Sequence, residues 1–599
     1  MKTICTLLFC LFIVFQATAQ PLQQVAPELL GMNSKQLWKA GEAVQRAVDE
    51  KQIPGAVLAV VHKGKLAYLK AYGNKQVYPD ILPMDVNTVF DLASVTKSVS
   101  TAISAMVLIE QGKLRFADKV SDFIPEFSPW TDEEGNTKVD IRVIDLLTHT
   151  SGLPSYASVK VLKEKYGTTS PDVMIDHIAT VKRHFRPKTG FQYSCLNYIT
   201  LQKIIETVSG QSLRDFAKEN IYDVLGMYNT DYMPSGDMLA NCAPTEKQPD
   251  GSVLKGVVHD PLAREMMNGV SGNAGLFSDA NDLAVLAAAL LNKGEYNGKR
   301  VLSPLGVQTM SKVPRNISHL GRTPGWDTYS PYSSNNGDLL GPNTYGHTGY
   351  TGTSIILDPD NDIAVILLTN RAHPDDQGEA GRLRSLVANA VAASVGTAPE
   401  RTYTPHYYKR VESFNDELPI GNKDIVFLGN SLTEGGDWSK MFNKKNIRNR
   451  GIVGDEALGI YDRLYQILPG KPAKIFFMIG VNDISHDLTT DTIVNRITSV
   501  IQKIRTESPK TKLYVQSLLP FDESVGRYKR LNGKTGMVPE INVRLKQIAA
   551  DNGCIFLDLF PQFVRPGTNV LRKELATDGL HLNQEGYRIW SEAIRKYVK

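Results

Sequence analysis

The last third of the sequence alternates short apolar runs with helical repeats, and this pattern restricts the fold more than any other feature. The runs lie at 425–428, 475–479, 513–519 and 555–559. Each is apolar on both faces, which is typical of central strands in a parallel sheet. Between two of the runs, Ile493, Ile497 and Ile504 recur at helical spacing. The pattern therefore predicts a three-layer α/β/α domain with a parallel sheet over residues 423–599.

A second domain must precede this one, because 599 residues exceed what one hydrophobic core usually organises. Apolar, alternating and helical segments fill residues 30–395. The stretch 396–422 is rich in polar residues, proline and tyrosine without clear periodicity, so we expect a linker there.

The N-terminus predicts export. Lys2 precedes an apolar run over 7–15, and Ala17 and Ala19 supply the small residues that signal peptidase needs. We expect residues 1–19 to be removed and the protein to be periplasmic or secreted. No later run reaches the ~18 apolar residues of a membrane span, so no transmembrane anchor is expected.

The composition excludes several classes of function. Hydrophobic residues make up 42% and charged residues 22%, which is typical of a globular protein, and a net charge of +4 is too small to indicate nucleic-acid binding. No metal-ligand cluster, phosphate loop or nucleotide fingerprint is visible, so no metal or other cofactor is expected. The expected partners are small-molecule or glycan ester substrates, and the sequence is silent on the oligomeric state.

Ser94 and Lys97 begin the first candidate site. They form an S-x-x-K pattern before residues 98–112, whose apolar spacing predicts a helix. Residues three apart share a helix face, so Lys97 can reach the Ser94 hydroxyl. A lysine whose pKa is lowered by burial can take the proton of a serine alcohol, which is otherwise a poor nucleophile.

Two later segments complete a family pattern. Tyr193 follows Phe191-Gln192, and Tyr345-Gly346-His347-Thr348-Gly349-Tyr350 precedes a strand-like run. Serine, lysine, tyrosine and an x-T-G strand in this order resemble the serine β-lactamase and penicillin-binding protein family, in its class C and esterase branch. The resemblance covers about 30–393. It implies an antiparallel sheet flanked by helices, with a helical subdomain.

The resemblance also implies roles: Ser94 as acylated nucleophile, Lys97 as its proton acceptor, Tyr193 as second acid or base, and the Ser94 and Tyr350 backbone N–H groups as oxyanion hole. His347 stands where many relatives have lysine, and Cys195 where many have asparagine. The usual residues help to hold a β-lactam or a peptide. The departures therefore favour ester substrates.

A second candidate nucleophile, Ser431, leaves the first strand of the C-terminal domain and enters a helix. Converging N–H groups at such a position favour developing negative charge. Gly454, Asn482, Asp578 and His581 follow in order. This set resembles the SGNH branch of the GDSL hydrolases, over residues 424–599, and implies a flavodoxin-like sheet.

By this resemblance Ser431 attacks the acyl carbonyl, His581 takes its proton and Asp578 orients the imidazole. The N–H groups of Ser431 and Gly454 and the Asn482 side chain would hold the oxyanion. The loop around Gly454 is similar to that of SGNH domains that act on decorated sugars.

Three functions follow from these observations. The leading one is a secreted carboxylic ester hydrolase whose C-terminal domain removes small acyl groups, such as acetate, from carbohydrates. The second is acyl transfer by the N-terminal domain to a sugar or sterol hydroxyl. The third is a binding role for one retired domain, against which the complete nucleophile and base sets argue. β-Lactamase or D-alanyl peptidase activity is a minor alternative.

Overall fold

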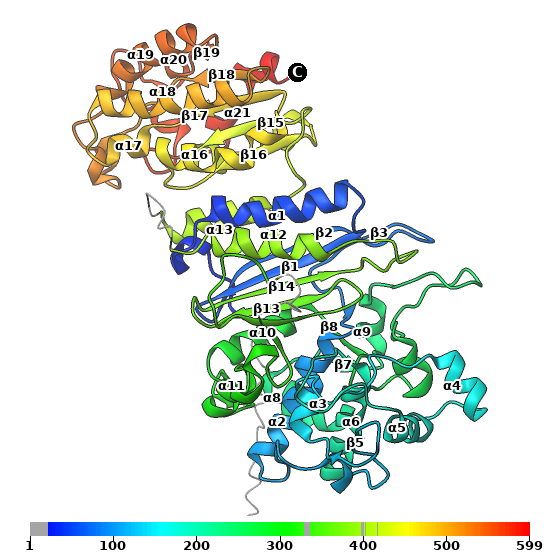
Figure 1. Ribbon diagram of the computed structural model, residues 1–599. Coiled ribbons are helices and arrows are strands. Elements are labelled where there is room, and N and C mark those ends of the chain that lie inside the picture. Colours follow the sequence, from blue (N-terminus) through cyan, green and yellow to red (C-terminus); the bar gives the residue numbers. More distant parts are fainter. Residues whose placement is uncertain (1–21, 321, 329–335, 397–400, 402, 416) are drawn as a thin grey trace, which may run out of the picture. The chain divides into compact units, whose positions relative to one another are not determined.

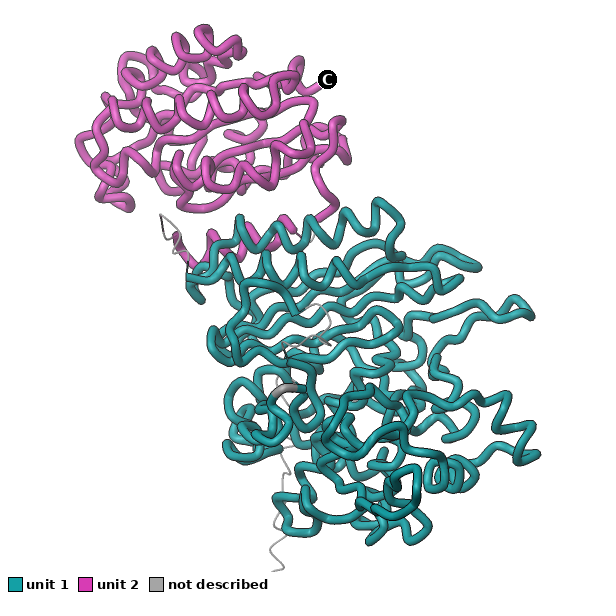
Figure 2. Tube along the Cα trace, in the orientation of Figure 1, with its two compact units in different colours: residues 1–399 teal, residues 400–599 magenta. Residues whose placement is uncertain are grey.

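The computed structural model describes residues 22–320, 322–328, 336–396, 401, 403–415 and 417–599. The chain divides into two compact units, residues 1–399 and 400–599 (Figure 2). The predicted export signal, residues 1–19, lies outside the described residues. In the part that is described, no helix has the length and apolar character of a membrane span.

An antiparallel sheet of seven strands organises the larger unit, in the order β11-β12-β13-β14-β1-β2-β3. Its strands are β1 (Gly55–His62), β2 (Lys65–Gln76), β3 (Leu82–Pro83), β11 (Asp327–Thr328), β12 (Tyr345–Thr348), β13 (Ser354–Asp358) and β14 (Ile363–Thr369). Side chains alternate across β1, so that Val57 and Ala59 enter one core and Ala56 and Leu58 enter the other. The sheet is therefore buried on both faces.

Helices cover these two faces (Figure 1). The helices α1 (Ser34–Asp49) and α12 (Gly381–Ala392) pack together on one face, and α10 (Ala280–Leu291) covers the other. Further described helices of this unit are η1 (Pro27–Leu30), η2 (Lys97–Ala102), α2 (Ile103–Glu110), η3 (Val120–Asp122), α3 (Val143–Leu147), α4 (Val159–Tyr166), α5 (Pro171–Thr180), α6 (Cys195–Ser209), α7 (Leu213–Ala217), η4 (Lys218–Tyr222), α8 (Asp223–Leu225), α9 (Gly236–Asn241), η5 (Leu262–Met266), α11 (Pro304–Met310) and η6 (Arg315–Leu320). Its short strands are β4 (Phe90–Asp91), β5 (Trp130–Thr131), β6 (Lys138–Val139), β7 (Asp231–Tyr232), β8 (Leu276–Ser278), β9 (Glu295–Tyr296) and β10 (Lys299–Arg300). This arrangement confirms the predicted antiparallel sheet with flanking helices.

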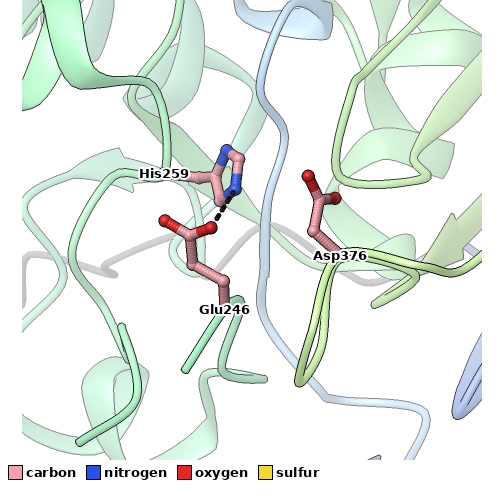
Figure 3. Close-up of side chains that lie close together, drawn as sticks. All are labelled: Glu246, His259 and Asp376. Atoms are coloured by element: carbon pink, nitrogen blue, oxygen red, sulfur yellow. Dashed lines mark ion pairs between the residues drawn. The ribbon is translucent and has the colours of Figure 1, made fainter. Parts of the chain in front are cut away.

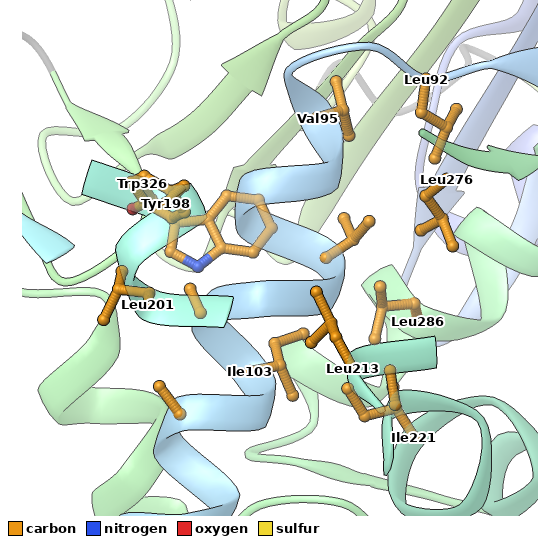
Figure 4. Packing of buried hydrophobic residues seen from close by; sticks show 14 of the residues in the cluster. Leu92, Val95, Ile103, Tyr198, Leu201, Leu213, Ile221, Leu276, Leu286 and Trp326 are labelled. Carbon is orange, nitrogen blue, oxygen red and sulfur yellow. The ribbon is translucent and has the colours of Figure 1, made fainter. Parts of the chain in front are cut away.

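The helix that follows Ser94 runs through the centre of the helical part. Every residue from 97 to 108 is buried, in the π-helical turn η2 and in α2. Ile103 packs among apolar side chains of α7, η4 and α10, including Leu213, Ile221 and Leu286 (Figure 4). This packing carries Lys97 into the interior, where its charge needs acceptors.

A parallel sheet of five strands forms the smaller unit, in the order β16-β15-β17-β18-β19. Its strands are β15 (Ile425–Gly429), β16 (Ile447–Gly451), β17 (Lys474–Met478), β18 (Lys512–Gln516) and β19 (Ile555–Leu557). Its longer helices are α16 (Ala457–Arg463), α18 (Thr490–Glu507), α19 (Met537–Asp551) and α21 (Gln584–Val598), and its shorter ones are α14 (Ser431–Glu434), α15 (Trp438–Phe442), α17 (Val481–Ser485) and α20 (Phe560–Phe563). The predicted parallel, flavodoxin-like sheet is confirmed, since its order matches that of flavodoxin.

The sequence pattern predicted four of these strands but not β16. This strand is at the edge of the sheet and carries Arg448, Asn449 and Arg450 in place of an apolar run. An edge strand has one neighbour and exposes part of its surface, so polar residues are tolerated there. Its sequence therefore lacks the signal of a central strand.

The stretch 396–422 differs from the irregular linker that the sequence predicts, because it contains helix α13 (Pro405–Asn415). Tyr407, Val411 and Phe414 of this helix are buried. The Tyr407 hydroxyl donates to the Gly459 carbonyl at 2.8 Å, so α13 packs on the smaller unit. The apolar residues of α13 have helical spacing, but the many polar residues around them made this periodicity hard to recognise in the sequence.

Deleting α13 should destabilise the smaller unit. A chain of residues 423–599 should lose at least about 3 kcal/mol in free energy of unfolding relative to residues 401–599, since several buried side chains are lost, each worth roughly 1.5–3 kcal/mol. Urea unfolding followed by circular dichroism measures the difference. Equal stability of the two chains would show that α13 is only a tether.

Candidate active sites

Lys97 and Ser94 lie side by side at the start of η2. The Lys97 Nζ donates to Ser94 Oγ at 3.0 Å and to the Asn273 carbonyl oxygen at 2.9 Å, and it contacts Cys195 Sγ at 3.6 Å. The lysine is fully buried. Three acceptors around one nitrogen match the three hydrogens of an ammonium group.

The surroundings raise the pKa of Lys97. Burial by itself lowers that pKa, but the ionisable Cys195 and Tyr193 side chains favour the charged amine and outweigh it. This direction is opposite to the one that the sequence analysis expects from burial alone. The resting lysine is therefore a charged donor, and Cys195 has a basic neighbour that its sequence context does not reveal.

Tyr193 lies between this lysine and a buried histidine. Lys97 Nζ is 4.9 Å from the Tyr193 ring centroid, and the ring centroids of Tyr193 and His149 are 4.6 Å apart. His149 Nδ1 accepts from the Ser194 N–H at 3.0 Å. Burial, with the nearby cations Arg322 and Lys97, holds the pKa of His149 well below its usual value. A neutral imidazole thus supports the tyrosine ring.

His347 lies on β12 beside these groups as a neutral acceptor. Its Nδ1 donates to the Thr348 carbonyl oxygen at 2.9 Å, which leaves Nε2 with its lone pair. Burial, together with Arg322 and Lys97, holds the pKa of His347 well below its usual value. An imidazole lone pair therefore stands where the resemblance leads one to expect a lysine cation.

Backbone donors for an oxyanion are present at this site. Within the described residues, the N–H groups of Ser94 and Tyr350 have no hydrogen-bond acceptor. Gly349, next to Tyr350, approaches the loop before Ser94, because a Cβ on it would lie 2.4 Å from the Leu92 carbonyl oxygen. The two donor segments are therefore packed against each other.

A cavity of about 530 Å³ opens onto these groups. It is lined by Ser94, Phe191, Tyr193, Arg322, Asp327, His347, Thr348, Gly349, Tyr350, Arg371, Gly378, Glu379, Ala380, Gly381 and Arg384. The lining contains three arginines and two carboxylates, Asp327 and Glu379, so it carries a net positive charge. Burial lowers the pKa of Arg384 to about 10, so this arginine remains charged at neutral pH. These arginines could not be recognised from the sequence, because they are far apart in the chain and belong to no motif.

The second site is a hydrogen-bonded chain of three side chains. Ser431 Oγ is 2.9 Å from His581 Nε2, and His581 Nδ1 is 2.9 Å from Asp578 Oδ2. Burial raises the pKa of Asp578, but hydrogen bonds from the backbone and side chain of His581, among others, outweigh it and hold the pKa below its usual value. Asp578 is therefore ionised and can stabilise an imidazolium.

Three neighbouring strands place the oxyanion donors. Ser431 follows β15, Gly454 follows β16 and Asn482 follows β17, so all lie at the carboxyl ends of the strands where the strand order reverses. Asn482 Nδ2 donates one hydrogen to the Asp455 carbonyl at 2.8 Å, which leaves its other hydrogen for a ligand. The Gly454 N–H has no acceptor within the described residues.

Buried ion pairs and side-chain bonds hold these loops. Asp455 Oδ2 and Arg463 Nη2 are 2.8 Å apart, and both side chains are almost fully buried. Glu434 Oε2 accepts from the Val453 N–H at 2.6 Å. Asn430 caps α14 by accepting from the Leu432 N–H at 3.1 Å. The donors are thus set by the fold before a substrate arrives.

Tyr528 also belongs to this site, although the sequence analysis missed it. Its hydroxyl donates to Asp578 Oδ2 at 2.8 Å and lies 3.0 Å from His581 Nδ1. Tyr528 lies in a loop about fifty residues before the histidine and matches no motif. The base and its carboxylate therefore share a third polar partner.

Comparisons with known proteins agree with this division. The "Beta-lactamase" family model matches residues 40–389, and the "GDSL-like Lipase/Acylhydrolase family" model matches residues 427–589. An N-acetylmuramyl-L-alanine amidase of Bacillus subtilis (strain 168) is 33% identical over 379 residues, which are 58% of this chain and 83% of the relative.

Two solved structures resemble the larger unit. One is EstCE1, a hydrolase with promiscuous acyltransferase activity, at 24% identity and a TM-score of 0.49, covering 60% of this chain and 99% of its own. The other is the simvastatin synthase LovD of Aspergillus terreus, at 22% identity and a TM-score of 0.47, covering 60% of this chain and 98% of its own.

Replacing Tyr528 with phenylalanine should shift the pH profile of the Ser431-dependent reaction. The Tyr528 hydroxyl is one of the donors that lower the Asp578 pKa, so without it that pKa rises and the carboxylate becomes a stronger acceptor for the imidazolium. We expect the acidic limb of kcat/KM to move up by roughly 0.3–0.7 pH units, within the range that single hydrogen bonds produce.

The matched control is Tyr597→Phe. Tyr597 belongs to the same unit, and its ring centroid lies 5.5 Å from that of Tyr514. Its pH profile should equal that of the unmodified protein. An unchanged profile in Tyr528→Phe would reduce Tyr528 to a packing residue.

Proposed function

The chain belongs to the beta-lactamase family and carries a GDSL-like acylhydrolase domain after it, and we propose that both domains hydrolyse acyl bonds through acyl-serine intermediates. In this proposal the chain is exported, and its C-terminal domain removes small acyl groups such as acetate from carbohydrate esters. The proposal rests mainly on two consecutive hydrogen bonds. Ser431 Oγ is bonded to His581 Nε2, and His581 Nδ1 is bonded to Asp578 Oδ2, each at 2.9 Å.

The C-terminal reaction runs in two steps. Ser431 Oγ attacks the ester carbonyl while His581 Nε2 takes the serine proton, and the negative oxygen is held by the Ser431 and Gly454 N–H groups and by Asn482. His581 then gives its proton to the leaving alcohol. A water molecule, deprotonated by the same imidazole, hydrolyses the acyl-serine and restores the free enzyme.

The N-terminal reaction uses a different proton acceptor. Because Lys97 is charged at rest, its ammonium donates to Ser94 Oγ and is not free to take the serine proton. In our proposal Tyr193, which lines the cavity beside Ser94, relays the serine proton to the leaving group. The N–H groups of Ser94 and Tyr350 hold the oxyanion, and Lys97 acts by charge and by positioning.

A second candidate for the N-terminal domain is hydrolysis of an amide in an acidic muramyl peptide. Two observations favour it: the name of the Bacillus subtilis relative, and the basic lining of the cavity at Ser94. Arg322, Arg371 and Arg384 supply the positive charge that the neutral His347 does not. The absence of the lysine and asparagine that many relatives have therefore does not by itself exclude a carboxylate-bearing substrate.

Ser94→Ala and Ser431→Ala should remove different activities. We expect Ser431→Ala to abolish release of acetate from acetylated sugars, and Ser94→Ala to abolish hydrolysis of a second substrate class. Each loss should be roughly 10³-fold or more, as for other serine nucleophiles. The assay panel contains aryl esters, acetylated sugars, N-acetylmuramyl peptides and a cephalosporin. If neither variant loses any activity on this panel, the proposed chemistry is wrong.

Arg322→Gln should raise KM for muramyl peptides by roughly tenfold, because one charge-assisted hydrogen bond to the substrate is lost. The KM for neutral aryl esters should rise less. The Arg322 side chain contacts Asp327 at 3.5 Å. The control is Arg214→Gln. Arg214 also forms an ion pair, with Asp231 at 2.8 Å, but it does not line the cavity. Equal changes for acidic and neutral substrates would reject the amide candidate.

A further inference from the structure

Three possible metal ligands meet near the first site, in segments far apart in the chain (Figure 3). They are Glu246 in the loop after α9, His259 before η5, and Asp376 after β14. One ligand atom from each lies within 4.8 Å of the other two. The Lys247 N–H donates to the Pro374 carbonyl at 2.7 Å, which ties the two loops that carry the carboxylates.

The histidine nitrogen in this cluster is buried without a hydrogen bond. His259 Nε2 has no hydrogen-bond partner among the described residues, and its side chain is 12% exposed. It lies 3.7 Å from Glu246 Oε2, which is too long for a hydrogen bond. Two ligands on one tetrahedral zinc ion are separated by roughly 3.3–3.4 Å, given bonds of about 2.0–2.1 Å. The pair is therefore spaced more like co-ligands than like a hydrogen-bonded ion pair.

Asp376 faces the same place with an oxygen that also lacks a hydrogen bond. Its Oδ1 is buried without a hydrogen-bond partner within the described part of the chain, although Arg371 Nη1 lies 3.3 Å away. Two of the three side chains therefore contain a buried polar atom without a hydrogen bond, and the three side chains bring ligand atoms within 4.8 Å of one another. A cation between them would satisfy both.

Neighbouring groups hold two of the three residues, His259 and Asp376, in place. Asp376 Oδ2 accepts from the Tyr350 hydroxyl at 2.7 Å, and the Tyr350 ring stacks on His259 with centroids 5.4 Å apart. The backbone N–H of His259 donates to Asp91 Oδ2 at 2.7 Å, and Arg264 Nη1 donates to the backbone carbonyl of His259 at 2.6 Å. Such outer contacts orient metal ligands in proteins.

We propose that Glu246, His259 and Asp376 bind one divalent transition-metal ion, Zn²⁺, with water completing the coordination. One imidazole nitrogen with two carboxylates is a donor set that zinc accepts, whereas calcium and magnesium prefer oxygen ligands alone. The two carboxylates carry two negative charges against the two positive charges of the ion, and Arg371 next to Asp376 adds one positive charge. Because Tyr350 contacts both His259 and Asp376, the ion stabilises the segment that borders the Ser94 cavity.

Zinc binding is measured on the full exported chain after removal of metal with a chelator. Isothermal titration calorimetry and elemental analysis after gel filtration should give one Zn²⁺ per chain, and Zn²⁺ should raise the midpoint of thermal unfolding. Glu246→Gln and His259→Gln keep the size and polarity of the side chains and should lose both effects. Retention of full stoichiometry in both variants would overturn the proposal.

The matched control is His486→Gln. His486 also faces a glutamate, Glu456, but its Nδ1 lies at 2.8 Å, a hydrogen-bond distance. This variant should bind Zn²⁺ as the unmodified protein does, and loss of zinc from it would place the ion elsewhere.

Co²⁺ absorption tests the unmodified protein directly, so the result does not depend on the folding of any variant. Co²⁺ added to the metal-free chain should produce visible d–d bands of a four-coordinate site, and one equivalent of Zn²⁺ should remove them. A spectrum equal to that of hydrated Co²⁺ would reject the site.

Discussion

One buried charge, the Lys97 ammonium, governs the arrangement of the larger unit. A charge without water needs hydrogen-bond acceptors on its donors, since the desolvation cost is otherwise large. The acceptors come from three segments: Ser94 in the turn before the helix, the Asn273 carbonyl before β8, and Cys195 at the start of α6. The helix through the core, the loop before β8 and α6 are therefore held together at the point where the nucleophile lies.

The smaller unit places its nucleophile by topology. In a parallel sheet the carboxyl ends of all strands lie at one edge, and loops diverge where the strand order reverses. Ser431, Gly454 and Asn482 each follow one of three adjacent strands, so their donors converge without a buried charge. Asp578 and His581 complete the set from a single turn near the C-terminus, because the Asp578 carboxylate also accepts the His581 N–H at 2.8 Å.

In the proposed reactions the two sites move protons in different ways. At Ser431 the base is the His581 imidazole, which accepts from the serine hydroxyl. The ionised Asp578 carboxylate is bonded to the other nitrogen of this imidazole. At Ser94 the nearest nitrogen is a charged donor, and in the proposed reaction the serine proton passes through Tyr193 instead. Two separate solutions to serine activation in one chain are compatible with two different acyl substrates.

The sequence by itself determined the fold class and named the residues of both candidate sites, because apolar runs and short motifs are local features. Ser94 with Lys97, and Asp578 with His581, are three residues apart and could be paired from spacing alone. The edge strand β16 and helix α13 could not be recognised, since polar residues interrupt their patterns. Only the tertiary structure placed Tyr528 on Asp578, gathered Arg322 and Arg384 in one cavity, and brought Glu246 to His259 and Asp376. It also decided the direction of the Lys97 pKa, because that depends on which groups share its buried surroundings.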